Sequence, residues 1–459
     1  MIRNYQSQDK IFQLMPPSYY RDNRENNFTV IVGKNGTGKS RLLQGVVSEI
    51  LTRHLGTQQF EREERVGRIR SQFRSIEFDD LPRKVICVST SPFDKFPLLR
   101  RIAPVSIYSY LGLRGLPSGN LSTAYMARIM ASLVTAVARS HRKTRGVIDV
   151  LHYLGYDGII HCTFTVGLPS RIQEEILDAR NPLKAIADLH QSYPLTPIET
   201  SYQLRQLKDA DPEMLMRAVE LFRLYKKSGR RPRIDLVLDS TGIYGGGPEI
   251  EDLLLLVGTG FARLRDVSLQ KSRGLMEPEI FRISEASSGE QSVIMGLLGI
   301  ASQIEDHSLI CIDEPEVCLH PEWQERYVHL LVDTFSNRRN CQFLIATHSP
   351  QVVAELPSSA CFVMNMDDGI AVDASALSRR SVDFQLAQVF KTPGRHNEFL
   401  NRTALNLFSR VSQRKEFSRE DCNSLAMLTE LREHIHANDP LHDLIIALEA
   451  LKGLHGRDC

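Results

Sequence analysis

The sequence has no long apolar run and almost no net charge. Its most apolar stretch, LLLLVGTGFA (253–262), contains glycines and is shorter than the roughly 18 to 20 residues that a membrane helix needs. The first ten residues, MIRNYQSQDK, lack the apolar core of a signal peptide. With 56 Lys and Arg against 55 Asp and Glu, the net charge is +1, so any nucleic-acid contact must come from a local patch. We expect a cytoplasmic protein with no membrane partner.

The chain also lacks CxxC pairs, internal repeats and low-complexity tracts. Among its eight cysteines, Cys87 and Cys311 lie in apolar runs typical of strands, so reduced thiols in the core are expected. The apolar fraction of 42% and the charged fraction of 24% are those of a folded globular protein. A length of 459 residues exceeds one ordinary core and predicts two or three substructures.

A glycine-rich segment near the N-terminus, FTVIVGKNGTGKSRLLQGVVSEIL (28–51), predicts a strand, a loop and a helix, and the loop matches G-x-x-x-x-G-K-[ST]. Glycines let backbone N–H groups converge on phosphate oxygens, and the helix adds its positive N-terminal end. Lys39 is a catalytic candidate whose positive charge would contact the β- and γ-phosphates, and the Ser40 hydroxyl would bind Mg²⁺. The predicted nucleotide-binding residues are Gly33, Lys34, Asn35, Gly36, Thr37, Gly38, Lys39 and Ser40.

Two acids follow a short apolar run in HSLICIDEPEVCLHPEWQ (307–324). A parallel strand there would deliver them to the sheet edge at which α/β proteins bind ligands. Asp313 is predicted to hold Mg²⁺ and Glu314 to polarise the attacking water. A second such strand, CQFLIATHSPQVV (341–353), ends at His348, a catalytic candidate that would reach the γ-phosphate. Taken alone, the acids fit a solvated strand end and the histidine a structural role; beside the glycine-rich loop, the nucleotide site is favoured.

In this order the motifs resemble those of the ABC-type ATPase superfamily, in its SMC, RecF and OLD-like branch. GKNGTGKS resembles the P-loop, SSGEQ (287–291) the signature, LICIDE the Mg²⁺-carboxylate strand and ATHS the histidine switch. The resemblance implies an α/β head with a mixed sheet flanked by helices, ATP and Mg²⁺ as cofactors, and a signature that closes over ATP on a partner's P-loop. Ser288, Gly289 and Gln291 match the signature's serine, first glycine and glutamine. Ser287 replaces its leucine and Glu290 its second glycine, which leaves the turnover rate open.

The domain organisation follows from the positions of these motifs. We expect the N-terminal lobe of the ATPase head at 1–100, a compact and mainly helical insertion at 101–280, the C-terminal lobe at 281–373, and a helical segment at 374–459. The insertion shows no sustained heptad pattern. Helices are predicted over 121–141 and 211–227, and an extended segment over 159–166.

Several further segments are weaker candidates. The family's glutamine loop should fall within VICVSTSPFDKFP (85–97), which has no glutamine and offers residues 89–94 instead; Tyr20 or Arg21 are candidates for contact with adenine or phosphate. The basic clusters ARSHRKTRG (138–146) and KKSGRRPR (226–233), with the mixed-charge run at 61–74, leave contact with nucleic-acid phosphates open, beside the alternative of solvated helix ends.

No nuclease domain is expected in this chain. The paired acids of FVMNMDDGIAVD (362–373) could belong to a Toprim-like nuclease site, but Asp-Gly between two short apolar runs favours a hairpin turn. An HNH site is not expected at His396, because no second histidine is nearby. The whole resembles ATPase subunits of bacterial anti-phage systems of the Septu and retron-associated kinds. This implies an ATPase that dimerises on ATP, or forms a higher oligomer, and controls a separate effector such as an HNH-type nuclease or a toxin. The alternative is a DNA-repair ATPase of the RecF or SMC kind that binds DNA directly; a transporter subunit fits poorly.

Overall fold

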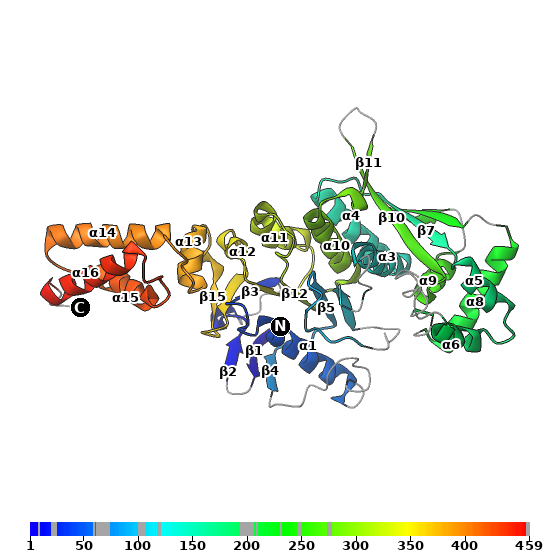
Figure 1. Cartoon of the computed structure of the whole chain (residues 1–459), viewed down its shortest axis with the longest axis horizontal. Coiled ribbons are helices and arrows are strands. Elements are labelled where there is room, and N and C mark those ends of the chain that lie inside the picture. The colour runs from blue at the N-terminus through cyan, green and yellow to red at the C-terminus, as the bar shows by residue number, and fades with distance from the viewer. Residues whose placement is uncertain are drawn as a thin grey trace.

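The computed structural model describes the chain outside residues 8–9, 20–24, 58–59, 61–73, 100–106, 115, 117–120, 193–205, 208–209, 230–231, 246–248, 273–277 and 456–459. The molecule is elongated, with a central sheet, the inserted region at one end and the C-terminal helices at the other (Figure 1). Among the described residues, no helix combines the length and the apolar character needed to cross a membrane.

The central sheet has seven strands in the order β15-β14-β3-β13-β12-β5-β6, and every neighbouring pair is parallel except β14 and β15. All residues of β3, β5, β12 and β13 are buried, which explains why the strands are mostly apolar, with polar residues chiefly at their ends. The strands are β3 (Asn27–Val32), β5 (Lys84–Ser89), β6 (Tyr108–Gly112), β12 (Ser308–Asp313), β13 (Gln342–Thr347), β14 (Cys361–Asn365) and β15 (Ala371–Asp373). This mixed sheet and its flanking helices confirm the predicted α/β class.

Helices cover both faces of this sheet. Helix α1 (Lys39–Leu55) packs on one face, where its Val46 and Ile50 share a core with Leu309 and Leu344. Helix α10 (Ser288–Gln303) packs on the other, against residues that alternate with these along the strands, such as Ile310. On the α10 side lie α3 (Leu121–Arg139), α4 (His141–Tyr153) and α11 (Pro321–Thr334), and α12 (Pro350–Ala354) contacts α11.

A small three-stranded sheet, ordered β2-β1-β4, flanks α1 on its other side. Its strands are β1 (Ile2–Ser7), β2 (Lys10–Gln13) and β4 (Arg74–Phe78), and the short helix η1 (Pro17–Tyr19) follows β2. Tyr5 reaches α1 at Gly45, where an added Cβ would lie 2.0 Å from the tyrosine oxygen. Gly45 is therefore required for close approach of sheet and helix.

The inserted region combines helices with a second sheet of five antiparallel strands, ordered β11-β10-β7-β8-β9. The predicted helices are present as α3 and α8, and the predicted extended segment is β7. The sequence did not predict that the extended segments pair into one sheet. Its elements are β7 (Ile160–Val166), α5 (Ser170–Asp178), α6 (Pro182–Ser192), α8 (Pro212–Lys227), β8 (Arg233–Asp239), β9 (Gly242–Gly245), α9 (Ile250–Thr259), β10 (Ala262–Lys271) and β11 (Glu279–Arg282), with η3 (Ile283–Glu285) leading into α10.

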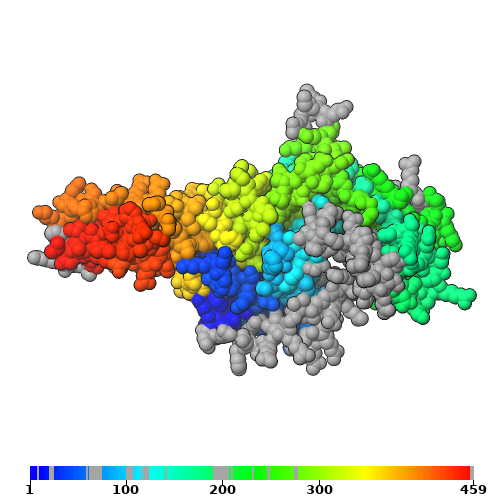
Figure 2. Space-filling view, in the orientation of Figure 1, coloured from blue at the N-terminus to red at the C-terminus, as the bar shows by residue number. Residues whose placement is uncertain are grey.

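The C-terminal residues begin with the predicted hairpin and end in helices. Strands β14 and β15 pair as a hairpin whose turn contains Gly369 at φ 72°, so this prediction is confirmed. After η4 (Ala374–Ala376), α13 (Val382–Phe384) and the π-helix η5 (Gln385–Val389), helices α14 (Glu398–Arg414), α15 (Arg419–Arg432) and α16 (Pro440–His455) pack around their own apolar core. Figure 2 shows them as a lobe that projects from the head.

Candidate functional site

The glycine-rich loop joins β3 to α1 at the carboxyl edge of the central sheet. Gly36 and Gly38 have φ values of 85° and 99°, which residues with a Cβ rarely adopt. The Thr37 hydroxyl donates to the Lys34 carbonyl at 2.8 Å and closes the loop. The backbone is thus curved as a phosphate cradle requires, and α1 begins directly behind it at Lys39.

Lys39 points back into this loop. Its ammonium donates to the carbonyls of Gly33 at 2.8 Å and Lys34 at 3.3 Å, and the side chain is buried. Burial lowers the pKa of Lys39, and the nearby carboxylates of Glu314 and Glu316 oppose this effect. The Lys39 ammonium therefore lies inside the loop, where it could donate to the oxygens of a bound phosphate instead of to these two carbonyl oxygens.

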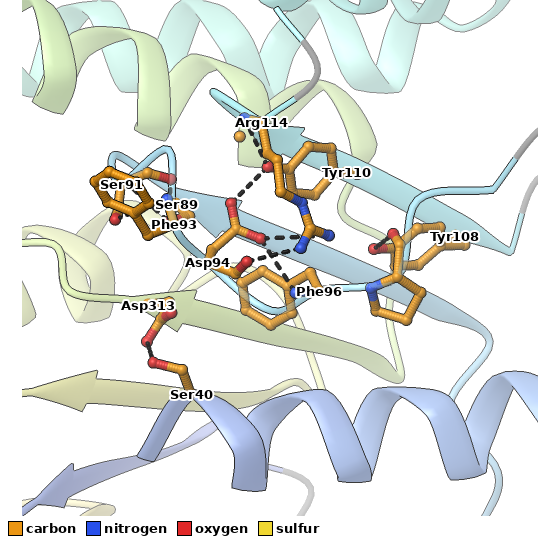
Figure 3. A network of polar contacts seen from close by, with 12 residues as sticks. Ser40, Ser89, Ser91, Phe93, Asp94, Phe96, Tyr108, Tyr110, Arg114 and Asp313 are labelled. Carbon is orange, nitrogen blue, oxygen red and sulfur yellow. Dashed lines mark hydrogen bonds and ion pairs between the residues drawn. The ribbon is translucent and has the colours of Figure 1, made fainter. Parts of the chain in front are cut away.

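Ser40 and Asp313 meet across the edge of the sheet. The Ser40 hydroxyl at the start of α1 donates to Asp313 Oδ1 at the end of β12, at 3.0 Å (Figure 3). Burial raises the pKa of Asp313 to about 7, and the hydrogen bond from Ser40 opposes the rise. A hydroxyl and a carboxylate that face each other supply the oxygen ligands that Mg²⁺ prefers, so both residues fit a bound Mg²⁺.

Glu314 and His348 lie side by side, each directly after the end of one of the neighbouring strands β12 and β13. His348 Nδ1 is 3.4 Å from Glu314 Oε1, and the Glu314 N–H donates to the Ala346 carbonyl at 2.9 Å. Glu314 has φ 50°, an uncommon value for a residue with a side chain, so the chain turns sharply after Asp313. Hydrogen bonds to Glu314 and Glu316 raise the pKa of His348 to about 10, and the bond from His348 lowers the pKa of Glu314. Near neutral pH the pair is therefore an ionised carboxylate beside an imidazolium.

Glu316 belongs to the same cluster and was missed by the sequence analysis. It is 6% exposed, and its Oε1 accepts from the His348 backbone N–H at 2.7 Å and lies 3.0 Å from His348 Nδ1. Next to the histidine, the Ser349 hydroxyl donates to Gln324 Oε1 of α11 at 2.6 Å. A signal was present in the sequence, because Glu316 is an acid two residues after Glu314 in a segment that reads EPE.

The loop after β5 lies against Glu314. The Thr90 hydroxyl donates to the Glu314 carbonyl at 3.2 Å. Buried Asp94 accepts from the Tyr110 hydroxyl at 2.6 Å, and Arg114 donates to the Asp94 carbonyl at 2.7 Å (Figure 3). Burial raises the pKa of Asp94. The loop after β5 therefore contacts the backbone of the predicted catalytic acid through a threonine, and a role of residues 89–94 as the glutamine loop stays a prediction.

The signature residues lie at the start of α10. Ser287 is the N-cap, and Glu290 completes a capping box: Glu290 Oε2 accepts from the Ser287 N–H at 3.0 Å, and Ser287 Oγ accepts from the Glu290 N–H at 3.3 Å. The two departures from the family pattern thus form one hydrogen-bonded pair. Ser288 is exposed, and the Gln291 amide donates to the Ala286 carbonyl at 3.0 Å.

Gly289, at the start of α10, packs against the segment that follows Glu314 and Glu316. A Cβ at Gly289 would lie 2.8 Å from the Cys318 carbonyl oxygen, so no larger residue fits there without a shift. Helices α1 and α10 lie on opposite faces of the sheet, and the signature and the P-loop of one chain are separated by its thickness. The structure brings the P-loop, Asp313, Glu314 and His348 together, and it places Ser288, Gly289 and Gln291 at the N-terminus of α10, on the opposite face of the sheet from α1.

The remaining candidates are the basic clusters and the residues proposed to contact adenine or phosphate. Some of their charged side chains are paired with acids of the same chain, and others lie outside the residues that the structure describes. In the cluster 138–146, Arg142 pairs with Asp306 at 3.3 Å and Lys143 with Glu305 at 3.2 Å, just before β12 and at the end remote from Asp313. Tyr20, Arg21, most of the run 61–74 and part of the cluster 226–233 lie outside the described residues.

A family model described as "AAA domain, putative AbiEii toxin, Type IV TA system" matches residues 251–354. These residues include the start of α10, both carboxylates of the DE pair and His348.

Three relatives match shorter segments. "Protein ea59" of Escherichia phage lambda is 38% identical over 73 residues, covering 16% of this chain and 14% of that protein. "Retron Vc95 probable ATPase" of Vibrio cholerae serotype O1 biovar El Tor is 31% identical over 100 residues, or 19% and 18% of the two chains. "Retron Ec83 probable ATPase" of Escherichia coli is 23% identical over 208 residues, or 41% and 36%. This chain therefore covers about a third or less of each relative.

Among solved structures, an Smc head domain of Pyrococcus furiosus, bound to the C-terminal domain of ScpA, aligns with 82% of this chain and 97% of its own. The TM-score is 0.27 at 14% identity, too low to support an argument about function.

Proposed function

We propose that this chain is an ABC/SMC-like ATPase, related to retron ATPases, that binds ATP with Mg²⁺, dimerises on it, hydrolyses it and thereby controls a separate effector protein. The observation that carries the catalytic part is the convergence of Lys39, Ser40, Asp313, Glu314 and His348 at one edge of the central sheet.

The nucleotide would bind by its phosphates. The N–H groups of the loop from Gly33 to Gly38 and the Lys39 ammonium would hold the β- and γ-phosphates. Ser40 and Asp313 would hold Mg²⁺, which neutralises the phosphate charge that develops in the transition state. The hydrogen bond between Ser40 and Asp313 supports this assignment, since it keeps both oxygens at the position that the ion would take.

Hydrolysis needs a base for water and a cation for the γ-phosphate. The Glu314 carboxylate, whose pKa is lowered by the hydrogen bond from His348, would orient the water and accept its proton as the water oxygen attacks the γ-phosphorus and the bond to ADP breaks. His348, positively charged and half exposed, would donate a hydrogen bond to the departing phosphate.

Dimerisation would complete the site from a second copy. Since α1 and α10 of one chain lie on opposite faces of its sheet, the N-terminus of α10 is better placed to cover a partner's P-loop than its own. Ser288 and Gly289 would then offer a hydroxyl and unpaired N–H groups to the partner's γ-phosphate, with Gln291 beside them. Assembly beyond a dimer and a cytoplasmic location remain predictions.

Control of an effector rests on the retron relatives, of which this chain covers only a part. The effector would be a nuclease of the HNH type or a toxin encoded nearby, in a defence role. The rival function, direct binding of DNA, has less support because Arg142 and Lys143 of the basic cluster are paired with acids of the same chain.

The test compares Lys39→Ala with Arg41→Ala, a cation on the exposed side of the same helix. We expect Lys39→Ala to lose binding of a fluorescent ATP analogue and to lose phosphate release, and Arg41→Ala to retain both. Native binding and turnover in Lys39→Ala would refute the proposed site. Purification with the native operon tests the effector: co-elution of a nuclease or toxin supports it, and salt-dependent DNA binding by the chain alone supports the rival.

A further inference from the structure

Glu316 is a buried carboxylate with an unequal distribution of hydrogen bonds. Its side chain is 4% exposed. Oε1 accepts from the His348 backbone N–H at 2.7 Å and lies 3.0 Å from the ring nitrogen Nδ1 of the same residue. Oε2 is buried without a hydrogen-bond partner among the described residues. Since a buried unsatisfied oxygen is costly, its retention calls for an explanation.

The two contacts hold His348 at two points. The backbone contact fixes the position at which the chain leaves β13, and the ring contact fixes the rotation of the imidazole. A hydrogen bond from Nδ1 to these carboxylate oxygens requires a proton on Nδ1, and Nε2 lies on the other side of the imidazole ring from the contacting atom. Both carboxylates lie on the Nδ1 side of the ring, so Nε2 is the ring nitrogen left available to a ligand.

Glu316 also shares the ring with Glu314. The Nδ1 distance is 3.0 Å to Glu316 and 3.4 Å to Glu314, so Glu316 makes the shorter contact. Without Glu316, the imidazole would have Glu314 as its only carboxylate partner and would pair with it closely. That pairing would occupy the oxygen that Glu314 needs for water.

We propose that Glu316 is a positioning residue for ATP hydrolysis: it anchors His348 so that Nε2 faces the terminal phosphate, and it keeps the His348 ring from capturing the Glu314 carboxylate. The inference rests on the hydrolysis proposed above. It explains the orphan oxygen, since the charge is needed for its effect on His348 and Oε2 is left over once Oε1 has made both contacts.

Three substitutions of Glu316 separate the effect of its side-chain length from the effect of its charge. Glu316→Gln keeps the length and an accepting oxygen but removes the charge. Glu316→Asp keeps the charge but is one methylene shorter, so it cannot reach both the backbone nitrogen and the ring nitrogen Nδ1 of His348. Glu316→Ala removes both properties. Glu322→Gln, at an exposed position in the first turn of α11, is the matched control.

The experiment measures kcat and KM for ATP in each variant, alone and combined with His348→Ala. We expect Glu316→Ala and Glu316→Asp to lower kcat on the order of tenfold with KM within about twofold, and Glu316→Gln to fall between them and the native chain. In the His348→Ala background the Glu316 substitutions should have no further effect, because their action passes through the histidine.

Several results would overturn the inference: native kcat in Glu316→Ala, a change in KM alone, or losses that multiply in the double variant. Glu316→Gln preserves shape, and its thermal unfolding checks that the fold persists, so the test survives if the Ala or Asp chain does not fold. Lys39→Ala, measured beside them, separates the two proposals. If it retains ATP binding, the proposed site fails; if only the Glu316 prediction fails, the proposed function stands.

Discussion

Glu290 places a negative charge where the proposed dimer would bind a phosphate. Its carboxylate accepts from the N–H and hydroxyl of Ser287, at 3.0 and 2.9 Å, and so lies over the first turn of α10. An anion bound to the N–H groups of Ser288 and Gly289 would be about 5 Å away, the pitch of one helical turn. We predict that Glu290→Gln strengthens ATP-dependent dimerisation, because glutamine can keep the capping contact without the charge.

The size of the effect follows from Coulomb's law. For two unit charges about 5 Å apart in a mostly aqueous setting with a dielectric constant of about 60, the repulsion is about 1 kcal/mol. A symmetric dimer has two such nucleotide sites, so removing both repulsions should make the free energy of dimerisation more favourable by about 2 kcal/mol, or roughly 30-fold in the dimerisation constant. The loss of the helix-dipole interaction, about 0.3–1 kcal/mol, lowers folding stability in both monomer and dimer and cancels from the comparison.

The assay is sedimentation equilibrium with saturating MgATP, in chains that also carry Glu314→Gln so that ATP is conserved. Glu285→Gln removes an exposed acid five residues earlier and serves as the control. The gain should shrink as salt is raised, since screening weakens the repulsion. Dimerisation that is unchanged or weaker in Glu290→Gln would refute the placement of phosphate at this helix end.

The remaining predictions concern the catalytic pair and the signature. Glu314→Gln should retain bound ATP and trap the dimer while phosphate release slows at least tenfold; release at the native rate in a malachite-green assay would exclude Glu314 as the base. Ser288→Arg should abolish dimerisation in light scattering and leave ATP binding by the monomer intact, whereas Ser409→Arg on exposed α14 should do neither. The pKa of His348 is raised from 6.5 to about 10, so its stabilising contribution is full below pH 6.5 and is lost as pH rises through 10. The excess unfolding free energy of the native chain over His348→Ala should therefore shrink between pH 6 and pH 10 in urea titrations, and a constant difference would contradict the assigned pKa.

The sequence predicted the head better than the insertion, for a physical reason. Buried parallel strands such as LICID are continuously apolar and end at polar residues, so both the strand and the edge it serves can be inferred from one short segment. The strands of the insertion alternate apolar and polar residues, as in RIDLVLD, which predicts a half-buried strand but not its partners. Pairing between β7 and β10 joins residues about a hundred positions apart, and no local pattern encodes it.

Roles that depend on contacts between particular side chains were harder still to predict from the sequence. The sequence identified Ser287 and Glu290 as departures from a family pattern, but only the structure shows that they bind each other. Glu316 was passed over because its proposed role depends on contacts with His348, which lies 32 residues further along the chain, directly after β13. The P-loop, by contrast, places all its groups within eight consecutive residues, and a contiguous motif can be read directly.

The close packing of Gly289 on the Cys318 carbonyl has a consequence for how two chains would work together. Cys318 lies two residues after Glu316, so the helix end offered to a neighbour moves with the segment that carries the chain's own acids. In a symmetric pair, any rearrangement at one ATP would be transmitted through this stiff backbone joint to the other. Two nucleotides in such a pair would be turned over as a coupled unit, in step or in alternation, rather than as independent events.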